Sequence, residues 1–214
     1  MRDSLLYFED YQEFDKFNSS LEEPFYSLYD LEQMGLEPLD PYDYLQFTIH
    51  DKKFRRNFFD DFYSLSNSCK IRKNPVEVSD SRIAASLYII NKKAKEDRDE
   101  ISSFSLSKAD YYRRRGRKDD LYFLKDRVLE KLDSEGKLKV LGYHTVDGDR
   151  WHRYICYGFE GFTYHMRVDK NDSRCKGLEN LGALTNWISS KRSVKTSMRY
   201  TTAVRVLHAY LKSK

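Results

Sequence analysis

The stretch that joins the two main patterns of this chain is Val128-Leu129-Glu130-Lys131-Leu132-Asp133-Ser134-Glu135-Gly136-Lys137-Leu138-Lys139-Val140. Apolar residues recur every three or four positions at the start of this stretch and just before it, at Leu121, Leu124, Val128 and Leu132. That spacing is typical of one face of a helix. Ser134-Glu135-Gly136 indicates a helix end, because glycine readily adopts the left-handed conformation that closes a last turn. We therefore predict a helix that ends here and a strand that begins directly after it.

The residues that follow predict a small antiparallel sheet. Leu138–Val146 and Arg150–Phe159 flank Asp147-Gly148-Asp149, and an Asp-Gly turn between two strand-like runs is typical of a hairpin. A second turn leads into Phe162–Val168, where apolar and polar residues alternate. We therefore expect a three-stranded antiparallel β-meander at about residues 138–168.

The residues that precede the stretch predict helices. One helix is expected from Ser79 or Asp80 to about residue 100, with apolar side chains on one face at Ile83, Leu87 and Ile90. A short helical segment follows up to Tyr112. We expect Gly116 to separate that segment from the helix that ends near Ser134, because glycine is a poor helix former.

The N-terminal part of the chain is acidic and rich in aromatic residues. A spacing of three, at Leu5, Phe8, Tyr11, Phe14 and Phe17, predicts a short amphipathic helix. A second short helix is expected at about residues 25–34. Aromatic residues recur from Tyr42 to Tyr63, which predicts a further helical stretch. The polar residues 64–75, which end in a proline, indicate a domain boundary.

These patterns together predict an α+β protein that is mainly helical. We expect an acidic, aromatic-rich helical region at residues 1–66 and a basic α+β domain at residues 76–214. Two helices are expected to close the chain, at Leu178–Ile188 and Arg199–Leu211.

The segment from about residue 80 to about residue 160 resembles a winged helix-turn-helix domain. The resemblance depends on a leucine-rich helix end, a Glu-Gly stop and a basic, apolar strand that follows at once. In that family the helix enters a DNA groove and the hairpin forms the wing. The resemblance implies phosphate contacts at the entrance of the helix by Arg113, Arg114, Arg115, Arg117 and Lys118, and it directs Lys125 and Arg127 toward the groove.

The sequence departs from that family in two ways. The arginine run precedes the expected recognition helix, and the helix itself carries acids at Asp119, Asp120, Asp126, Glu130 and Asp133. Acids on a groove-facing surface would repel phosphate. The alternative is a helical connection with a solvated basic turn, so both interpretations stay open.

Charge is distributed unevenly along the 214 residues, which have a net charge of +4. Residues 1–51 contain 13 acidic and 2 basic side chains, a net of −11, whereas residues 52–214 contain 36 basic and 21 acidic side chains, a net of +15. A basic region of this size attracts polyanions through counterion release. A second basic cluster follows Glu179 and includes Lys191, Arg192, Lys195, Arg199 and Arg205.

The leading functional hypothesis is a non-enzymatic nucleic-acid-binding protein, DNA or RNA, in which these two basic clusters contact phosphate. Tyr111, Tyr112, Trp151 and Trp187 are the aromatic residues that could stack on bases. A second hypothesis is a protein inhibitor or adaptor, such as an antagonist of a nucleic-acid-targeting defence system, that binds its partner through acidic residues 1–51. In a third, those acids fold onto the basic body of the same chain and lower non-specific binding.

No catalytic or cofactor motif supports an enzyme. The chain has neither a P-loop nor a GxGxxG loop, so we expect no nucleotide cofactor. The residues that could bind a metal are His144, His152, Cys156, His165 and Cys175. Because no CxxC, HxH or HExxH spacing presets two ligands, we expect no metal site.

Three features of the sequence indicate a cytoplasmic protein without a membrane segment. The longest strongly apolar run, Leu87–Ile90, is far shorter than the roughly 20 residues that span a bilayer. Acidic residues stand where a signal peptide needs an apolar stretch. The three cysteines are an odd number, which favours a reducing compartment over a disulfide framework.

Overall fold

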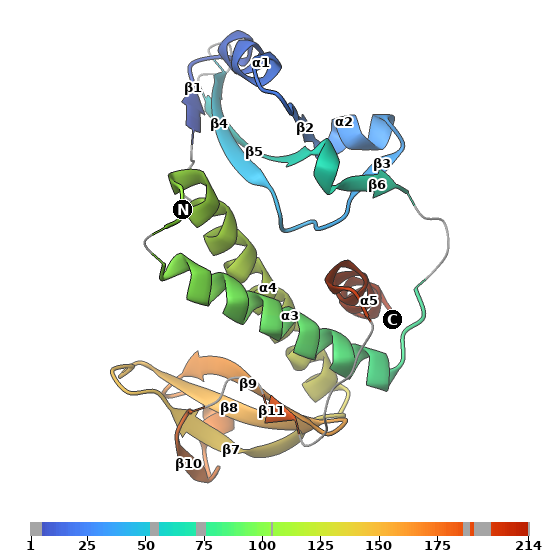
Figure 1. Cartoon of the computed structure of the whole chain (residues 1–214). Helices are drawn as coiled ribbons and strands as arrows, with labels where there is room; N and C mark the ends of the chain where they lie inside the picture. The colour runs from blue at the N-terminus through green and yellow to red at the C-terminus, as the bar shows by residue number, and fades with distance from the viewer. Residues whose placement is uncertain are drawn as a thin grey trace. The chain divides into compact units, whose positions relative to one another are not determined.

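The computed structural model describes residues 6–51, 56–71, 76–103, 105–185, 189–190 and 198–213. The chain forms two compact units. Unit 1 consists of Met1–Pro75 and Lys95–Asp120, and unit 2 of Val76–Ala94 and Leu121–Lys214. Helices and several sheets alternate along the chain, so the predicted α+β class is confirmed (Figure 1).

A four-stranded sheet forms the centre of unit 1, in the order β1 (Leu6–Phe8), β4 (Leu45–Asp51), β5 (Arg56–Ser64) and β2 (Phe25–Ser27). β1 runs parallel to β4, and the other neighbours are antiparallel. Helix α1 (Tyr11–Ser19) packs against the sheet through a hydrophobic core that consists of Ile49 and the aromatic residues Phe8, Phe14, Phe47 and Phe62. These rings contact one another at centroid distances of 4.8–5.9 Å, which gives unit 1 its own hydrophobic core.

A smaller element completes the N-terminal part of unit 1. Helix α2 (Leu28–Gln33) begins with a capping box, in which the side chains of Ser27 and Asp30 each satisfy the other's backbone N–H. The two-stranded sheet β3 (Leu36–Pro38) and β6 (Ser68–Lys70) follows, with the 3-10 turn Leu65–Asn67 before β6. A second small core of Leu31, Tyr44 and Tyr63 lies beneath these elements.

The prediction that residues 42–63 are helical is wrong, because β4 and β5 occupy most of this range, and residues 52–55 of it lie outside the described residues. Leu45, Phe47 and Ile49 alternate with Gln46, Thr48 and His50, which is the period of two that belongs to a strand. Interleaved aromatic residues further along this range obscured that alternation. The expected helices at 5–17 and 25–34 were correct only in part, since each begins with a short strand, β1 or β2.

Unit 2 contains a five-stranded sheet in the order β10-β7-β8-β9-β11. Its strands are β7 (Lys139–Thr145), β8 (His152–Phe159), β9 (Phe162–Asp169), β10 (Asn180–Ala183) and β11 (Ser189–Ser190). β7, β8 and β9 are consecutive and antiparallel, and β10 joins the edge of β7 in parallel. The sheet is thus larger than the three strands expected from the sequence.

The helices of this part of the chain are α3 (Asp80–Ile101), α4 (Lys108–Ser134) and α5 (Tyr200–Lys212). The parts of α3 and α4 that belong to unit 2 cover one face of the sheet (Figure 1), and α5 contacts α4, where Lys131 Nζ donates to the Tyr210 carbonyl at 2.8 Å. The Tyr164 hydroxyl on β9 donates to the backbone carbonyl of Ala84 on α3 at 2.7 Å. Leu124, Val128 and Leu132 of α4 are fully or nearly fully buried, so the periodic leucines form the helical side of this core.

The helix end predicted at residues 134–136 is confirmed. α4 ends at Ser134, and Gly136 has a φ of +69°. The backbone N–H groups of Gly136 and Lys137 donate to the carbonyls of Asp133 and Leu132, which is the hydrogen-bond pattern of a Schellman cap. The helices expected near 80–100 and 199–211 are also present, as α3 and α5.

Two helix predictions in this part of the chain are wrong. Gly116 does not interrupt α4, because flanking residues with good helix propensity carry the helix through a single glycine. Leu178–Ile188 is not a helix, since β10 occupies part of it and Gly182 has a φ of +83°. Residues 186–188 of that prediction lie outside the described residues.

The compact units divide the chain differently from the expected regions 1–66 and 76–214. Residues 95–120, from α3, α4 and their connection, group with the N-terminal sheet. The domain boundary expected at residues 64–75 stays a prediction. Within the described residues, no helix is long and apolar enough to cross a membrane.

Candidate functional site

The arginine run of α4 lies in unit 1, and its most buried member is Arg117. Arg117 Nε and Nη2 donate to Asp97 Oδ2 and Oδ1 at 2.7 and 2.6 Å. The side chain of Asp97 is completely buried. Arg117 Nη1 also lies 3.8 Å from Asp40 and 3.5 Å from Asp43. Burial lowers the pKa of Arg117, but its hydrogen bonds to Asp97 and the nearby acids raise it more, so this group is a fixed internal cation.

Neighbouring members of the run are also paired with acids of unit 1. Arg113 lies 3.3 Å from Asp43 and 2.9 Å from Asp110, and Arg114 pairs with Asp97 and Glu100. Lys118 lies 3.3 Å from the adjacent Asp119. Arg115, in contrast, is exposed. The structure therefore divides the expected phosphate-binding run into several ion-paired residues and one outward-facing arginine.

The two residues expected to face a groove differ in their surroundings. Lys125 is buried, and its Nζ donates to the backbone carbonyl of His165 on β9 at 2.7 Å. Arg127 is exposed and lies over the ring of Phe123, which is 65% exposed, at 5.8 Å. Lys125 therefore fastens α4 to the sheet, whereas Arg127 faces solvent.

The C-terminal cluster is described only in part. Arg199 is exposed at the start of α5, and Arg205 is half-buried on that helix. Lys191, Arg192 and Lys195 lie outside the described residues.

The two compact units carry opposite net charge. Unit 1 has 22 Asp and Glu against 17 Lys and Arg, a net of −5, even though it contains the arginine run. Unit 2 has 21 Lys and Arg against 12 Asp and Glu, a net of +9. The excess positive charge of the protein therefore belongs to unit 2.

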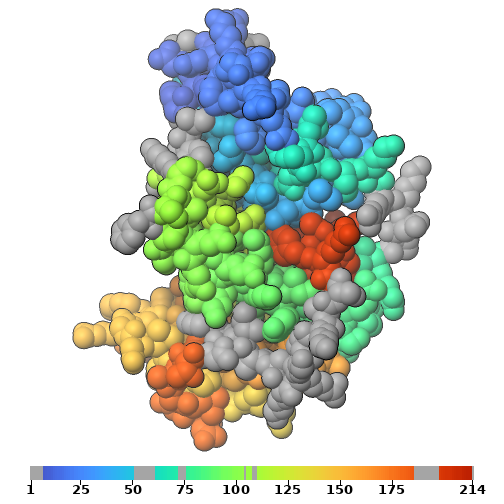
Figure 2. Space-filling model, in the orientation of Figure 1, coloured from blue at the N-terminus to red at the C-terminus, as the bar shows by residue number. Residues whose placement is uncertain are grey.

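An exposed tryptophan lies beside basic residues at one end of the unit 2 sheet. Trp151, directly before β8, is 71% exposed, and Lys170 Nζ lies 5.6 Å from the centre of its ring. The Lys170 backbone N–H donates to the Trp151 carbonyl at 2.9 Å, which holds the two residues together. Arg150 is exposed next to them. The β7–β8 turn protrudes from its surroundings in the space-filling view (Figure 2).

The aspartates of that turn have different surroundings. Asp149 accepts hydrogen bonds from the backbone N–H groups of Trp151 and His152, both at 3.1 Å, and from the Tyr154 hydroxyl at 2.8 Å. Desolvation raises the pKa of Asp149, but the bonds from Tyr154 and His152 outweigh it and lower the pKa to about 2. Asp147 is exposed. Asp149 therefore organises the turn that carries Trp151.

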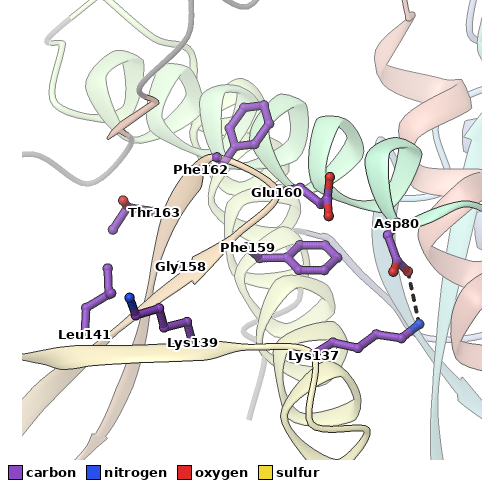
Figure 3. Close-up of a pocket in the computed structure, with 10 residues that line it drawn as sticks. Asp80, Lys137, Lys139, Leu141, Gly158, Phe159, Glu160, Phe162 and Thr163 are labelled. Atoms are coloured by element: carbon purple, nitrogen blue, oxygen red, sulfur yellow. Dashed lines mark hydrogen bonds and ion pairs between the residues drawn. The ribbon is translucent and has the colours of Figure 1, made fainter.

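A cavity of about 370 Å³ opens at the other end of β8 (Figure 3). Phe159 and Phe162 line it together with Lys137 and Lys139. Lys137 is engaged with Asp80 at 3.0 Å and Glu135 at 3.2 Å. The exposed Lys139 is the second cation of this hollow, so unit 2 has an aromatic and basic surface here as well.

The sheet also brings together three residues that the sequence did not connect into a site. One potential ligand atom from each of His144, Cys156 and His165 lies within 4.8 Å of the others. Their spacing in the sequence has no local motif, which is why the sequence predicts no metal site at these three residues. Burial raises the pKa of the Cys156 thiol.

No protein-family model matches this chain, and no solved structure matches it. A curated relative is the uncharacterized protein YkyB of Bacillus subtilis (strain 168), which is 33% identical over 97 residues. The similar region covers 44% of this chain and 60% of YkyB, so the chain spans less than two thirds of that relative's length.

Proposed function

We propose that this protein binds nucleic acid without catalysing a reaction, and that unit 2 makes the contacts. The observation that carries the proposal is the segregation of charge: unit 2 has a net charge of +9, while most of the arginine run forms ion pairs with acids within unit 1. A surface with excess cations gains affinity for polyanions by releasing condensed counterions. This supports binding that depends on the phosphate backbone.

The β7–β8 turn is the part of unit 2 best suited to contact a nucleic acid. Trp151 offers an exposed aromatic surface, and Arg150 and Lys170 place two cations beside it. Stacking of a base on an aromatic side chain contributes about 1–3 kcal/mol and tolerates any base. The geometry therefore favours a single strand whose base stacks on Trp151 while its phosphates meet the two cations.

The winged-helix interpretation gives a second mode of nucleic-acid binding, to duplex DNA. In it, the second half of α4 is the recognition helix and the β7–β8 hairpin is the wing. Phe123, Arg127 and Glu130 form the exposed side of that helix, since the periodic leucines are buried. Arg127 is the cation of this face. Of the other expected contacts, Arg199 and Arg205 of unit 2 stay candidates, as do Lys191, Arg192 and Lys195, whereas Arg115 belongs to unit 1 and is not a contact in this proposal.

The test measures binding of fluorescently labelled DNA and RNA oligonucleotides, single-stranded and duplex, by anisotropy over a range of salt concentrations. We expect affinity to fall steeply with salt and Trp151→Ala to weaken single-strand binding by about 1–3 kcal/mol. A double variant, Arg150→Ser with Lys170→Ser, should reduce the slope of log affinity against log salt by about 2.

The matched control is Arg115→Ser, which removes an exposed arginine from unit 1 and should leave affinity nearly unchanged. Binding that is absent at low salt, or that does not respond to salt, would refute the proposed function. Equal losses in Arg115→Ser and in the Trp151 and Arg150/Lys170 variants would refute the assignment of the contacts to unit 2.

A second candidate function is recognition of a protein partner by unit 1. Its surface exposes several large apolar side chains among acids: Tyr29 is 68% exposed, Met34 48% and Leu28 46%. All three lie on or next to α2, which also carries Asp30 and Glu32. An acidic surface with exposed apolar residues fits a basic protein, such as one that itself binds nucleic acid.

This second candidate predicts capture that survives nuclease treatment. Tyr29→Ser should abolish recovery of a partner from nuclease-treated lysate, whereas Trp151→Ala should not affect it. Recovery that disappears with nuclease in the unaltered protein would contradict the candidate, because the contact would then run through nucleic acid.

A further inference from the structure

We propose that His144, Cys156 and His165 form a binding site for one Zn²⁺ ion in unit 2. Each residue supplies one ligand atom, and the three atoms lie within 4.8 Å of one another. Two imidazoles and a thiolate are a donor set that suits zinc and related borderline metals. All three residues lie on strands of the unit 2 sheet, so this zinc site is independent of whether the protein binds nucleic acid.

The sheet register aligns the three residues on one face. Cys156 on β8 lies directly opposite His165 on β9. His144 on β7 lies opposite Tyr154, two residues along β8 from Cys156, so it is the diagonal neighbour of the cysteine on the same face. The rings of His144 and His165 approach to a centroid distance of 5.2 Å. Three strands therefore each contribute one ligand to the same point.

A register shift in β7 places His144 on this face. Val140 pairs with Tyr157, but Gly142 pairs with Cys156, so one additional residue is inserted between the two pairs. Continued without the shift, the first register would pair His144 with Arg153 and direct its ring to the opposite face of the sheet. The irregularity in β7 is therefore what brings the third ligand to the cysteine.

Gly142 makes the shift possible. Its φ is +145°, a conformation that residues with a side chain rarely adopt. A Cβ at this position would also lie 2.6 Å from the carbonyl oxygen of Glu179 and 2.8 Å from Leu181 Cγ. Position 142, where the register of β7 shifts, therefore requires glycine.

Burial and ring orientation favour metal ligation. Cys156 is 3% exposed and His165 4% exposed, and His144 is partly exposed. His144 Nδ1 lies 3.3 Å from the carbonyl oxygen of Gly182 on β10. A ring that donates from Nδ1 to this carbonyl presents Nε2 as the ligand, which is the usual way in which a backbone carbonyl orients a metal-binding histidine.

The distances are compatible with a tetrahedral site after a small adjustment. Zn–N distances of about 2.0–2.1 Å and a Zn–S distance of about 2.3 Å place neighbouring ligand atoms about 3.4–3.6 Å apart. Small side-chain rotations would bring the three ligand atoms, which lie within 4.8 Å of one another, to these separations. With three protein ligands, the fourth position takes a water molecule or another exchangeable ligand.

The test is a titration of the whole purified chain, first treated with a chelator and kept reduced, with Co²⁺ as a spectroscopic substitute for Zn²⁺. We expect one equivalent of Co²⁺ to bind with a thiolate-to-cobalt charge-transfer band, and Zn²⁺ to displace it. Cys156→Ser should remove the band, and His144→Asn should weaken Co²⁺ affinity at least about tenfold.

Cys175→Ser is the matched control, because Cys175 is also 3% exposed and lies in unit 2 but outside the cluster. It should keep both the band and the stoichiometry. Absence of a charge-transfer band in the unaltered protein, or retention of it in Cys156→Ser, would overturn the proposal. If Cys156→Ser does not fold, His144→Asn decides the question, and unchanged affinity in that folded variant would overturn the site.

Discussion

Arg117 binds Asp97 through two hydrogen bonds, Nε to Oδ2 at 2.7 Å and Nη2 to Oδ1 at 2.6 Å, with both side chains almost entirely removed from solvent. Such a bidentate pair fixes the geometry of both groups. It links α3 to α4 within unit 1. An arginine held in this way contributes to the fold, so charge in the sequence is not by itself a measure of charge on the surface.

Arg117→Met should destabilise unit 1 by about 3–5 kcal/mol, because it leaves the buried Asp97 carboxylate without its main partner. Chemical denaturation followed by circular dichroism measures the loss. The double variant Arg117→Met with Asp97→Leu should lose less than the single variant, since it removes both buried charges together. Equal stability of Arg117→Met and the unaltered protein would show that the pair does not form.

Arg115→Ala should change the free energy of unfolding by no more than about 0.5 kcal/mol, because Arg115 is the exposed member of its run. The triple variant of Arg113, Arg114 and Arg115 to Ala should be clearly less stable, since it also removes ion pairs to Asp43, Asp97 and Glu100. Thermal unfolding compares the two. If Arg115→Ala binds nucleic acid more weakly but is as stable as the unaltered protein, the arginine run would be part of the nucleic-acid-binding surface.

Asp149→Ala should loosen the β7–β8 turn, because it removes the acceptor for two backbone N–H groups and for the Tyr154 hydroxyl. Amide hydrogen exchange at Trp151 and His152 should become faster. Asp149→Asn should have a smaller effect, since its carbonyl still accepts the backbone bonds. Asp147→Asn is the control: it removes charge from the exposed part of the same turn and should leave exchange unchanged and nucleic-acid binding equal or tighter.

The same carboxylate predicts a dependence on pH. The pKa of Asp149 falls from the ordinary 3.8 to about 2 in the folded protein. A group whose pKa is lower in the folded state stabilises that state above its unfolded pKa, and the stabilisation is lost as pH falls from near 4 toward 2. The exchange rates of the Trp151 and His152 amides should therefore rise in this range after correction for intrinsic exchange. Asp149→Ala should not show this rise.

Gly142→Ala should destabilise unit 2 by more than the roughly 1–3 kcal/mol that backbone strain alone costs. The additional loss comes from a clash of the new Cβ with Glu179 and Leu181. Gly177→Ala separates the two causes: its φ is +76°, but a Cβ there meets nothing within 4 Å. The control should therefore lose only the strain contribution, about 1–2 kcal/mol. Chemical denaturation compares the two variants, and an equal loss would show that the close contact at Gly142 is absent.

Local pattern was sufficient for several elements of this fold. The leucines that precede Ser134 and the glycine at position 136 determine where α4 ends, because side-chain periodicity and a left-handed cap depend only on nearby residues. The Asp-Gly turn between β7 and β8 was predictable for the same reason. The excess of acids in residues 1–51 is likewise a property of the sequence alone.

Strand pairing and burial needed the tertiary structure. The range 42–63 has mixed periodicity, and only its pairing as β4 and β5 distinguishes strands from a helix. Whether Arg117 faces solvent or Asp97 depends on residues 20 positions apart, and Lys125 meets the His165 carbonyl 40 positions away. The proposed zinc site depends most on tertiary structure, because the register shift at Gly142 is what places His144 on the same face as Cys156 and His165. Local residue preferences specify turns and helix ends, whereas the face on which a strand residue lies is fixed by its pairing with distant parts of the chain.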